Sequence, residues 1–233
     1  MGKGFRELTS AAVPWSLPPD EESERATAAS NLLFTFPPAV VSTESGVVDP
    51  MIFHELPIHG AYLIEPEART DERGFFARTY CREQFRERGL TTDLVQCNES
   101  GSEAAATLRG MHYQLPPYAE TKLVRCIRGK LYDVVLDLRK DSPTFGRSYG
   151  AELSSTNRRM MYVPKGCAHG FVTLQHRTEA FYLTDEVYAP EAERGVRWDD
   201  PAFRIEWPIP PRVMSLKDRR HPNFQTSRAV VVS

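Results

Sequence analysis

Residues 122–139 read KLVRCIRGKLYDVVLDLR, and this stretch is the clearest indication of the fold. It consists of two short runs rich in aliphatic residues, separated by Gly129. Within residues 132–138, apolar side chains at the even positions alternate with a set that includes Asp133 and Asp137. Because successive side chains of a strand point to opposite faces, we expect one set inside and the other toward solvent or a cavity. We therefore predict two antiparallel strands joined by a hairpin turn at Gly129.

The same pattern continues on both sides of this pair. From Met51 onward, short runs of β-branched and aromatic residues are separated by Gly, Pro, Asp and Asn, and residues 152–174 and 179–188 supply further strands. Residues 82–89 have helical character, with Phe85 on the apolar side and a final glycine suited to end the helix. These features predict an all-β fold, a cupin-type jelly-roll β-sandwich or barrel with minor helices.

The chain divides by composition into three parts. Residues 1–50 are rich in Ser, Thr, Ala, Pro and Glu, which predicts a flexible N-terminal extension. An apolar patch at residues 32–36 leaves open the alternative that this extension docks on the core. We expect one domain over residues 51–225, followed by a tail at 226–233.

The charge balance argues against two classes of partner, and the cysteine content indicates the cellular compartment. The 233 residues carry 29 Lys and Arg against 31 Asp and Glu, a formal net charge of −2. This balance gives no field that would attract nucleic acid or an anionic membrane, so we expect neither as a partner. The cysteines form no CxxC pair and no dense disulfide pattern: Cys81, Cys97, Cys126 and Cys167. Because there is also no secretory signal and no apolar run of roughly 20 residues, we expect a cytoplasmic protein.

Three of the six histidines stand out by context: His112, His169 and His221. His112 lies in a predicted strand beside Arg109, Tyr113 and Gln114, so polar groups gather where a sandwich interior is ordinarily apolar. From the residues alone, His112 is either a catalytic group or a buried histidine satisfied by its neighbours. The other three histidines lie in predicted turns or loops and are expected at the surface.

A metal site is a further hypothesis at the same place. Pro164, Gly166 and His169 have the PxGxxH spacing of the second cupin motif, in which a turn delivers a histidine into the barrel. The position where metal-binding cupins carry an HxH pair here reads His112, Tyr113, Gln114. An amide oxygen is a weak ligand compared with imidazole or carboxylate, so we expect no metal and no other cofactor.

Ten motifs follow one another in an order that resembles the dTDP-4-dehydrorhamnose 3,5-epimerase family. They extend from about Ile52 to about Phe224 and read DERGFF, VQCNES, LRGMHYQ, KLVRCIRGKLYDVVLDLR, DSPTFG, LSSTNRR, VPKGCAHGF, VRWDDP, IEWP and MSLKD. The resemblance implies an isomerase, a homodimeric jelly roll that binds a nucleoside-diphosphate 4-keto-6-deoxy sugar. The expected reaction is epimerisation at C3, C5 or both, by removal of a proton next to the ketone and reprotonation from the opposite face.

The resemblance also assigns four catalytic roles. His112 would be the base, and Asp218 would orient and stabilise its imidazolium. Lys122 would offset charge on the enolate oxygen, and Tyr182 would return a proton from the opposite face of the ring. Without the resemblance, Asp218 would be interpreted as a helix or turn cap, Lys122 as a solvated strand-edge residue and Tyr182 as a core aromatic residue.

Seven further residues match substrate-binding positions of the family. The diphosphate would be bound by two arginines, Arg73 and Arg109, because a planar guanidinium group can form paired hydrogen bonds with phosphate oxygens. The nucleotide and sugar pocket would be lined by residues of three motifs: Gln96, Asn98, Ser100, Gln114 and His169. The resemblance gives His169 no specific chemical role.

Some positions depart from the family pattern. Arg78 stands where many members have a glutamate, and Val187 replaces an aromatic residue. Both departures fall where the nucleotide base is recognised, so the sequence leaves the identity of that base open. It also leaves open whether C3, C5 or both are epimerised. Two alternatives to the epimerase also stay open: a non-catalytic cupin that binds a sugar nucleotide, and a metal-dependent cupin isomerase or dioxygenase that uses His112 and His169.

Overall fold

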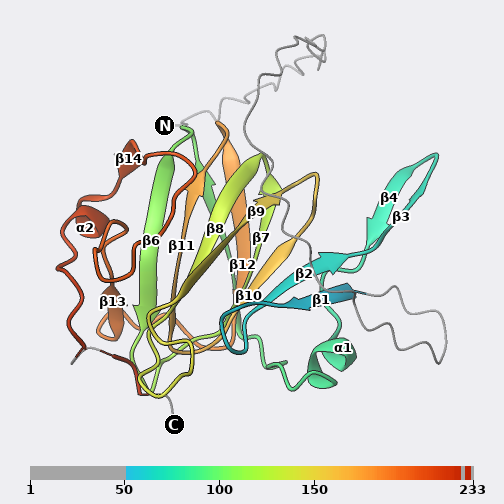
Figure 1. Cartoon of the computed structure of the whole chain (residues 1–233). Helices are drawn as coiled ribbons and strands as arrows, with labels where there is room; N and C mark the ends of the chain where they lie inside the picture. Colours follow the sequence, from blue (N-terminus) through green and yellow to red (C-terminus); the bar gives the residue numbers. More distant parts are fainter. Residues whose placement is uncertain (1–50, 227–228, 232–233) are drawn as a thin grey trace, which may run out of the picture. The chain divides into compact units, whose positions relative to one another are not determined.

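A computed structural model of the chain describes residues 51–226 and 229–231. Two antiparallel sheets pack face to face, and a small two-stranded ribbon extends from them (Figure 1). The predicted all-β architecture with short helices is confirmed. The predictions for residues 1–50 lie outside the described residues.

Each large sheet is assembled from strands that are distant in the sequence. The strands of the first sheet are, in spatial order, β1 (Met51–Glu55), β2 (Tyr62–Pro66), β10 (Met160–Val163), β7 (Lys122–Arg128), β12 (Thr178–Thr184) and β5 (Gln96–Ser102). Those of the second are β13 (Glu193–Gly195), β6 (Thr107–Gln114), β11 (Cys167–Thr173), β8 (Lys130–Asp137) and β9 (Ser148–Ser154), with β14 (Val213–Met214) parallel to β6. The ribbon consists of β3 (Ala68–Asp71) and β4 (Gly74–Ala77).

The predicted hairpin at Gly129 is wrong. Both runs of residues 122–139 are strands, but β7 belongs to the first sheet and β8 to the second. Gly129 has a φ of +72°, and an added Cβ would lie 2.7 Å from Oγ1 of Thr178, so only glycine fits this crossover. Alternation in a strand identifies its two faces but not its hydrogen-bonded neighbours, which here come from much later in the chain.

Three apolar clusters stabilise these layers. One fills the space between the two sheets and includes Leu63, Val124 and Val135. The other two lie on the outer faces: one under the C-terminal segment at Phe203, the other around Phe85. Burial of apolar surface in layers on both sides of each sheet is the main force that holds such a sandwich together.

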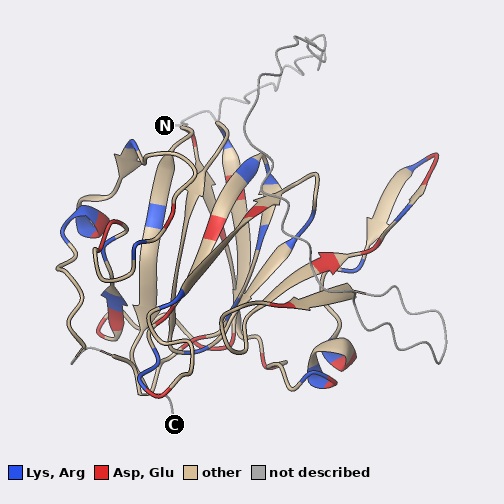
Figure 2. Ribbon diagram, in the orientation of Figure 1, with Lys and Arg blue, Asp and Glu red and all other residues tan. Residues whose placement is uncertain are grey.

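The alternation in β8 correctly separates its two faces, but it does not show that both faces are covered. Val135 packs between the sheets, and Asp133 and Asp137 share its face of the strand. On the other face, Val134 and Leu136 do not reach solvent, because they are buried against the C-terminal segment. Both faces of β8 are therefore covered, and Figure 2 shows acidic residues within this interior strand.

Two short helices are present in the described ranges. α1 (Arg82–Arg86) confirms the predicted helix, with Phe85 buried and Gly89 at a φ of +66° just beyond its end. α2 (Leu216–Arg219) begins after Ser215, whose hydroxyl accepts a hydrogen bond from the Asp218 backbone N–H. Within the described ranges, no helix has the length and apolar character needed to cross a membrane.

Candidate active site

The sandwich contains a cavity of about 830 Å³ that is lined from both sheets and from α2. A second cavity of about 450 Å³ is lined in part by the same residues: His112, Lys122 and Tyr182. His112 comes from β6 of the second sheet, whereas Lys122 and Tyr182 come from β7 and β12 of the first. A ligand in this space would therefore meet one group from one side and two from the other.

His112 forms a close pair with Asp218. Its Nε2 lies 2.6 Å from Oδ1 of Asp218, although the two residues are 106 positions apart in the chain. The aspartate side chain is 5% exposed and the histidine 30%, so the carboxylate is enclosed while the ring faces the cavity. Because an ionised carboxylate can only accept, the Nε2 atom carries the proton and leaves the lone pair of a neutral ring on Nδ1.

Asp218 is held as a carboxylate by its neighbours. Burial raises the pKa of the Asp218 carboxyl, but the hydrogen bond from His112 and the nearby ring of His221 outweigh burial. The net pKa is well below the ordinary range of an aspartate. Its backbone is fixed by the bond to Ser215 at the start of α2. The predicted alternative that Asp218 caps the helix is therefore wrong: Ser215 is the cap, and the Asp218 side chain turns toward His112.

A second histidine–aspartate pair lies on the neighbouring strand. His169 in β11 is directly opposite His112 in the β6–β11 register, and its Nε2 lies 2.8 Å from Oδ1 of Asp133 in β8. The side chain of His169 is 9% exposed and that of Asp133 is fully buried. His169, which the sequence predicts as a pocket residue, lies on the wall of the larger cavity.

Two glycines allow these strands to approach closely. An added Cβ on Gly110 would lie 2.5 Å from Cα of Gly170, and Gly110 has a φ of +130°. The register of the two strands shifts between His169 and Phe171, beside this contact. Only glycine at both positions lets β6 and β11 bring their histidines side by side in this way.

Lys122 and Tyr182 face the cavity from the first sheet. Nζ of Lys122 lies 3.0 Å from Oε1 of Glu120, and both side chains are 12% exposed. Burial raises the pKa of Tyr182, and the negative charge of Glu120 raises it further, while Arg109 lowers it. The phenol of Tyr182 is therefore protonated at neutral pH and can act as a proton donor.

Apart from Arg73, the predicted diphosphate and pocket residues divide between the two cavities. Arg109, in β6, lines the larger cavity and donates to Oγ of Ser102 and to the Gly101 carbonyl. Ser100 lines the same cavity, and its buried hydroxyl has no hydrogen-bond partner among the described residues. The smaller cavity is lined by the remaining three residues: Gln96, Asn98 and Gln114.

Gln114 has less freedom to bind a ligand than its position suggested. Its Nε2 donates to the carbonyls of Tyr118 and Val187, and its Oε1 accepts from the Ala189 N–H. The residue is only 2% exposed, and its side-chain hydrogen bonds go to backbone groups of the surrounding loops. In the structure Gln114 ties the wall of the smaller cavity together.

Arg73 is the predicted site residue that the structure does not bring to either cavity. It lies in the turn between β3 and β4, where its guanidinium pairs with Asp71. Its side chain is 83% exposed. Within one chain, this ribbon extends away from the two sheets (Figure 1).

Comparison with known proteins identifies the chain. The family model described as dTDP-4-dehydrorhamnose 3,5-epimerase matches residues 55–226. The chain belongs to this family. A dTDP-4-dehydrorhamnose 3,5-epimerase of Sinorhizobium fredii is 44% identical over 178 residues, which cover 76% of this chain and 91% of that protein. The predicted family, and with it the predicted class of carbohydrate epimerase, is confirmed.

Solved structures agree with this family membership. The crystal structure of the Bacillus anthracis epimerase with TDP and PPi bound is 43% identical, with a TM-score of 0.73 over 75% of this chain and 100% of that one. A 3'-monoepimerase of Streptomyces bikiniensis in complex with dTDP-quinovose is 34% identical, with a TM-score of 0.68 over 73% and 86% of the two chains. The predicted cupin-like jelly roll is therefore the fold of this family.

The sequence interpretation missed two partners of the candidate site and singled out a third without giving it a role. Asp133 bonds to His169, Glu120 pairs with Lys122, and His221 lies 3.7 Å from Asp218. Asp133 was visible as a charged residue in an otherwise apolar strand. His221 was singled out by its context, but its contact with Asp218 depends on the path of the chain just beyond the end of α2.

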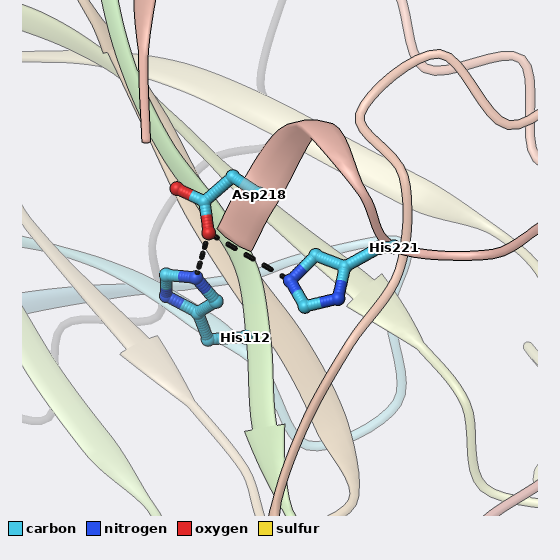
Figure 3. A group of neighbouring side chains, drawn as sticks. All are labelled: His112, Asp218 and His221. Atoms are coloured by element: carbon cyan, nitrogen blue, oxygen red, sulfur yellow. Dashed lines mark hydrogen bonds and ion pairs between the residues drawn. The ribbon is translucent and has the colours of Figure 1, made fainter. Parts of the chain in front are cut away.

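The metal-dependent alternative is not favoured by the geometry of its two expected ligands. The Nε2 atoms of His112 and His169 are each bonded to a carboxylate rather than directed at a shared point. A different set, His112, Asp218 and His221, lies within 4.8 Å and contains ligand types that bind cations (Figure 3). Two ligands of one zinc ion lie roughly 3 Å apart or more, so the 2.6 Å hydrogen bond of this set would have to open to admit an ion.

Proposed function

We propose that the chain epimerises a nucleoside-diphosphate 4-keto-6-deoxy sugar, with His112 as the base and Tyr182 as the opposing acid. The observation that carries this proposal is the placement of the His112–Asp218 pair on one sheet and of Lys122 and Tyr182 on the other, around shared cavities. Inversion needs groups on two faces of a sugar ring, since a base that returns its own proton to the same face changes nothing.

The first chemical step is removal of a proton from the carbon next to the ketone. The C–H bond breaks, the proton goes to Nδ1 of His112, and the electron pair moves into the enolate with its charge on the former ketone oxygen. Nδ1 has no hydrogen bond to any described residue, so it is available to accept this proton. Asp218 stabilises the resulting imidazolium through Nε2, and the ammonium of Lys122 stabilises the enolate oxygen.

The second step is protonation from the other face. The O–H bond of Tyr182 breaks as a new C–H bond forms and the enolate returns to the ketone. The imidazolium of His112 then releases its proton to solvent and the phenolate of Tyr182 takes one up, so both groups are restored. A phenol kept protonated by its buried surroundings is suited to this role. The same pair of groups can act at C3 or C5, depending on which carbon the pocket places next to His112.

For the nucleotide, thymidine diphosphate is the first candidate, because the Bacillus anthracis relative was solved with TDP. Arg109 would bind the diphosphate, and Ser100, Gln96 and Asn98 would contact the nucleotide or sugar. Arg78 and Val187 remain the positions where a different base would be accommodated. Deuterium exchange with thymidine, cytidine, uridine and guanosine 4-keto sugars would identify the preferred base.

The decisive experiment is deuterium wash-in. Purified protein in heavy water, without added metal or nicotinamide, should place deuterium at C3, C5 or both of the 4-keto sugar, as measured by NMR. His112→Ala should reduce exchange by about 10³-fold or more while circular dichroism is unchanged. If folded wild-type protein exchanges no proton on any of these substrates, the non-catalytic sugar-nucleotide-binding cupin becomes the better description.

We further propose that the protein works as a homodimer in which the partner's Arg73 completes the diphosphate site. In its own chain Arg73 is exposed on the ribbon, and the adjacent Phe75 and Phe76 are each 58% exposed. Exposed aromatic residues on a protruding ribbon are suited to contact with a second copy. Such a contact would bring Arg73 to a cavity that its own chain does not offer it.

A mixing experiment tests whether Arg73 acts across the interface. Arg73→Ala and Asp218→Asn should each be nearly inactive alone. After subunit exchange of an equal mixture, activity should return to roughly a quarter of wild type, because half the dimers are mixed and each has one intact site. Absence of recovery in verified mixed dimers, or a monomer in sedimentation, would contradict the proposal.

A further inference from the structure

His221 is a buried group next to the proposed base that the mechanism above does not use. Its Nε2 is buried and has no hydrogen-bond partner among the described residues. It lies 3.7 Å from Oδ1 of Asp218, the same oxygen that Nε2 of His112 contacts (Figure 3). Buried polar atoms without a partner are uncommon in proteins and call for an explanation.

The surroundings hold the His221 ring at this place. Gly195 of β13 packs directly on the ring: an added Cβ would lie 2.1 Å from Nε2. In the β6–β13 register, Gly195 is opposite His112, and the two imidazole rings meet edge to face with centroids 6.1 Å apart. A movement of about 0.7 Å would bring Nε2 within hydrogen-bond distance of Asp218.

We propose that His221 is a positioning residue for the base, whose Nε2–H donates to Oδ1 of Asp218 and thereby limits how strongly that carboxylate holds protonated His112. This inference rests on the proposed role of His112. A carboxylate oxygen has two lone pairs and can accept from both rings. A donor from His221 draws electron density away from the bond to His112, so the imidazolium of His112 is less stabilised and the neutral, active base persists to lower pH.

Other charged groups also face this cluster. They come from five elements, namely Glu193 of β13, Lys217 of α2, Lys122 of β7 and the His169–Asp133 pair of β11 and β8. Glu193 and Lys217 form an ion pair with each other, and His169 is bonded to Asp133. All of these groups are retained in the variants below, so a change between variants reports on His221.

The test is the pH profile of kcat/KM for deuterium exchange in His221→Phe, which keeps a planar ring but has no N–H. Without the donor, Asp218 should stabilise protonated His112 more strongly, so the acidic limb should move to higher pH by about half a unit to one unit. Activity on that limb should fall by about three- to tenfold, with the alkaline plateau within about twofold of wild type. His221→Gln, whose amide nitrogen can replace Nε2 as a donor, should restore the profile.

Two further variants guard against misfolding and general effects. Gly195→Ala keeps the histidine but displaces its ring, so it should move the acidic limb in the same direction even if His221→Phe does not fold. His176→Phe removes an exposed histidine from the turn after β11 and should leave the profile unchanged.

The outcomes separate this inference from the proposed function. If wild type exchanges deuterium, His112→Ala does not, and both His221→Phe and Gly195→Ala keep the wild-type acidic limb, only the role of His221 is refuted. Stoichiometric metal in wild type that is lost in His221→Phe would also refute it, because the ring would then be a ligand. If wild type shows no exchange at all, the proposed function itself fails.

Discussion

Two histidine–aspartate pairs lie side by side on the second sheet, and they differ in where the carboxylate comes from and in how open the ring is. His169 takes its partner Asp133 from the adjacent strand β8, and the pair is almost completely enclosed. His112 takes Asp218 from the short helix α2, and its ring is 30% exposed. The same two residue types thus make a closed pair that is fixed by strand register and an open pair that meets the cavity.

A histidine–aspartate contact therefore does not by itself identify a catalytic base. A base must reach substrate with its free nitrogen, and the open pair allows this, whereas the closed pair mainly satisfies two buried polar groups. The closed pair joins β11 to β8, and β11 in turn packs against β6 at the Gly110–Gly170 contact. The enclosed pair thus belongs to the strand that lies beside His112, without contacting the open pair directly.

The largest expected effect separates the two carboxylates by function. Asp218→Asn should reduce deuterium exchange by about 10³-fold or more, because the amide favours the wrong tautomer of His112 and cannot stabilise its imidazolium. Asp133→Asn should retain exchange within about tenfold but lower the free energy of unfolding by about 1.5–3 kcal/mol, through loss of a buried charged hydrogen bond. Exchange rates and urea unfolding measure the two quantities.

An opposite pattern would break the comparison. If Asp133→Asn abolished exchange while Asp218→Asn only destabilised the fold, His169 would be the better candidate for the base. Asn157, whose side chain bonds within the turn before β10, provides a matched control away from both pairs. Asn157→Ala should lower stability without an effect on exchange.

A smaller effect concerns acid stability. The pKa of Asp218 in the folded protein is well below its ordinary value, so the folded state binds fewer protons there than the unfolded state. The stabilisation is therefore present above the unfolded value and is lost as the pH falls below about 4. The wild-type advantage in unfolding free energy over Asp218→Asn should shrink between roughly pH 5 and pH 3, as measured by urea titrations. If the difference in unfolding free energy stayed constant across this range, the pair would stabilise the fold through packing and not through charge.

The sequence predicted the strands well and their neighbours poorly. Alternation located β8, and short runs of aliphatic, β-branched and aromatic residues located β7, β11 and β12, because both are local properties of the chain. The partner of β7 was wrong, since strand pairing depends on which distant apolar faces fit together. The helix at Phe85 was predictable from its spacing and its final glycine.

The candidate site was predictable only in part, for similar reasons. His112 stood out as a polar residue in a strand, but its pairing with Asp218 came from the family resemblance, since nothing local joins residues 106 positions apart. Arg73 was matched by motif, yet its own chain leaves it far from the cavities, which a single sequence does not reveal. Gln114 lines its cavity, but its bonds to backbone groups depend on loops that meet only in the folded chain.

The origin of Asp218 in α2 also sets an order of events during synthesis. A ribosome that has completed β13 has already made nearly every strand of both sheets, together with His112, Lys122 and Tyr182. The carboxylate that would activate the base is still to be translated. The apolar segment that covers the outer face of β8 is also still to be made. In the proposed mechanism, proton abstraction would therefore begin only after this late segment has packed on the second sheet and brought α2 over β6.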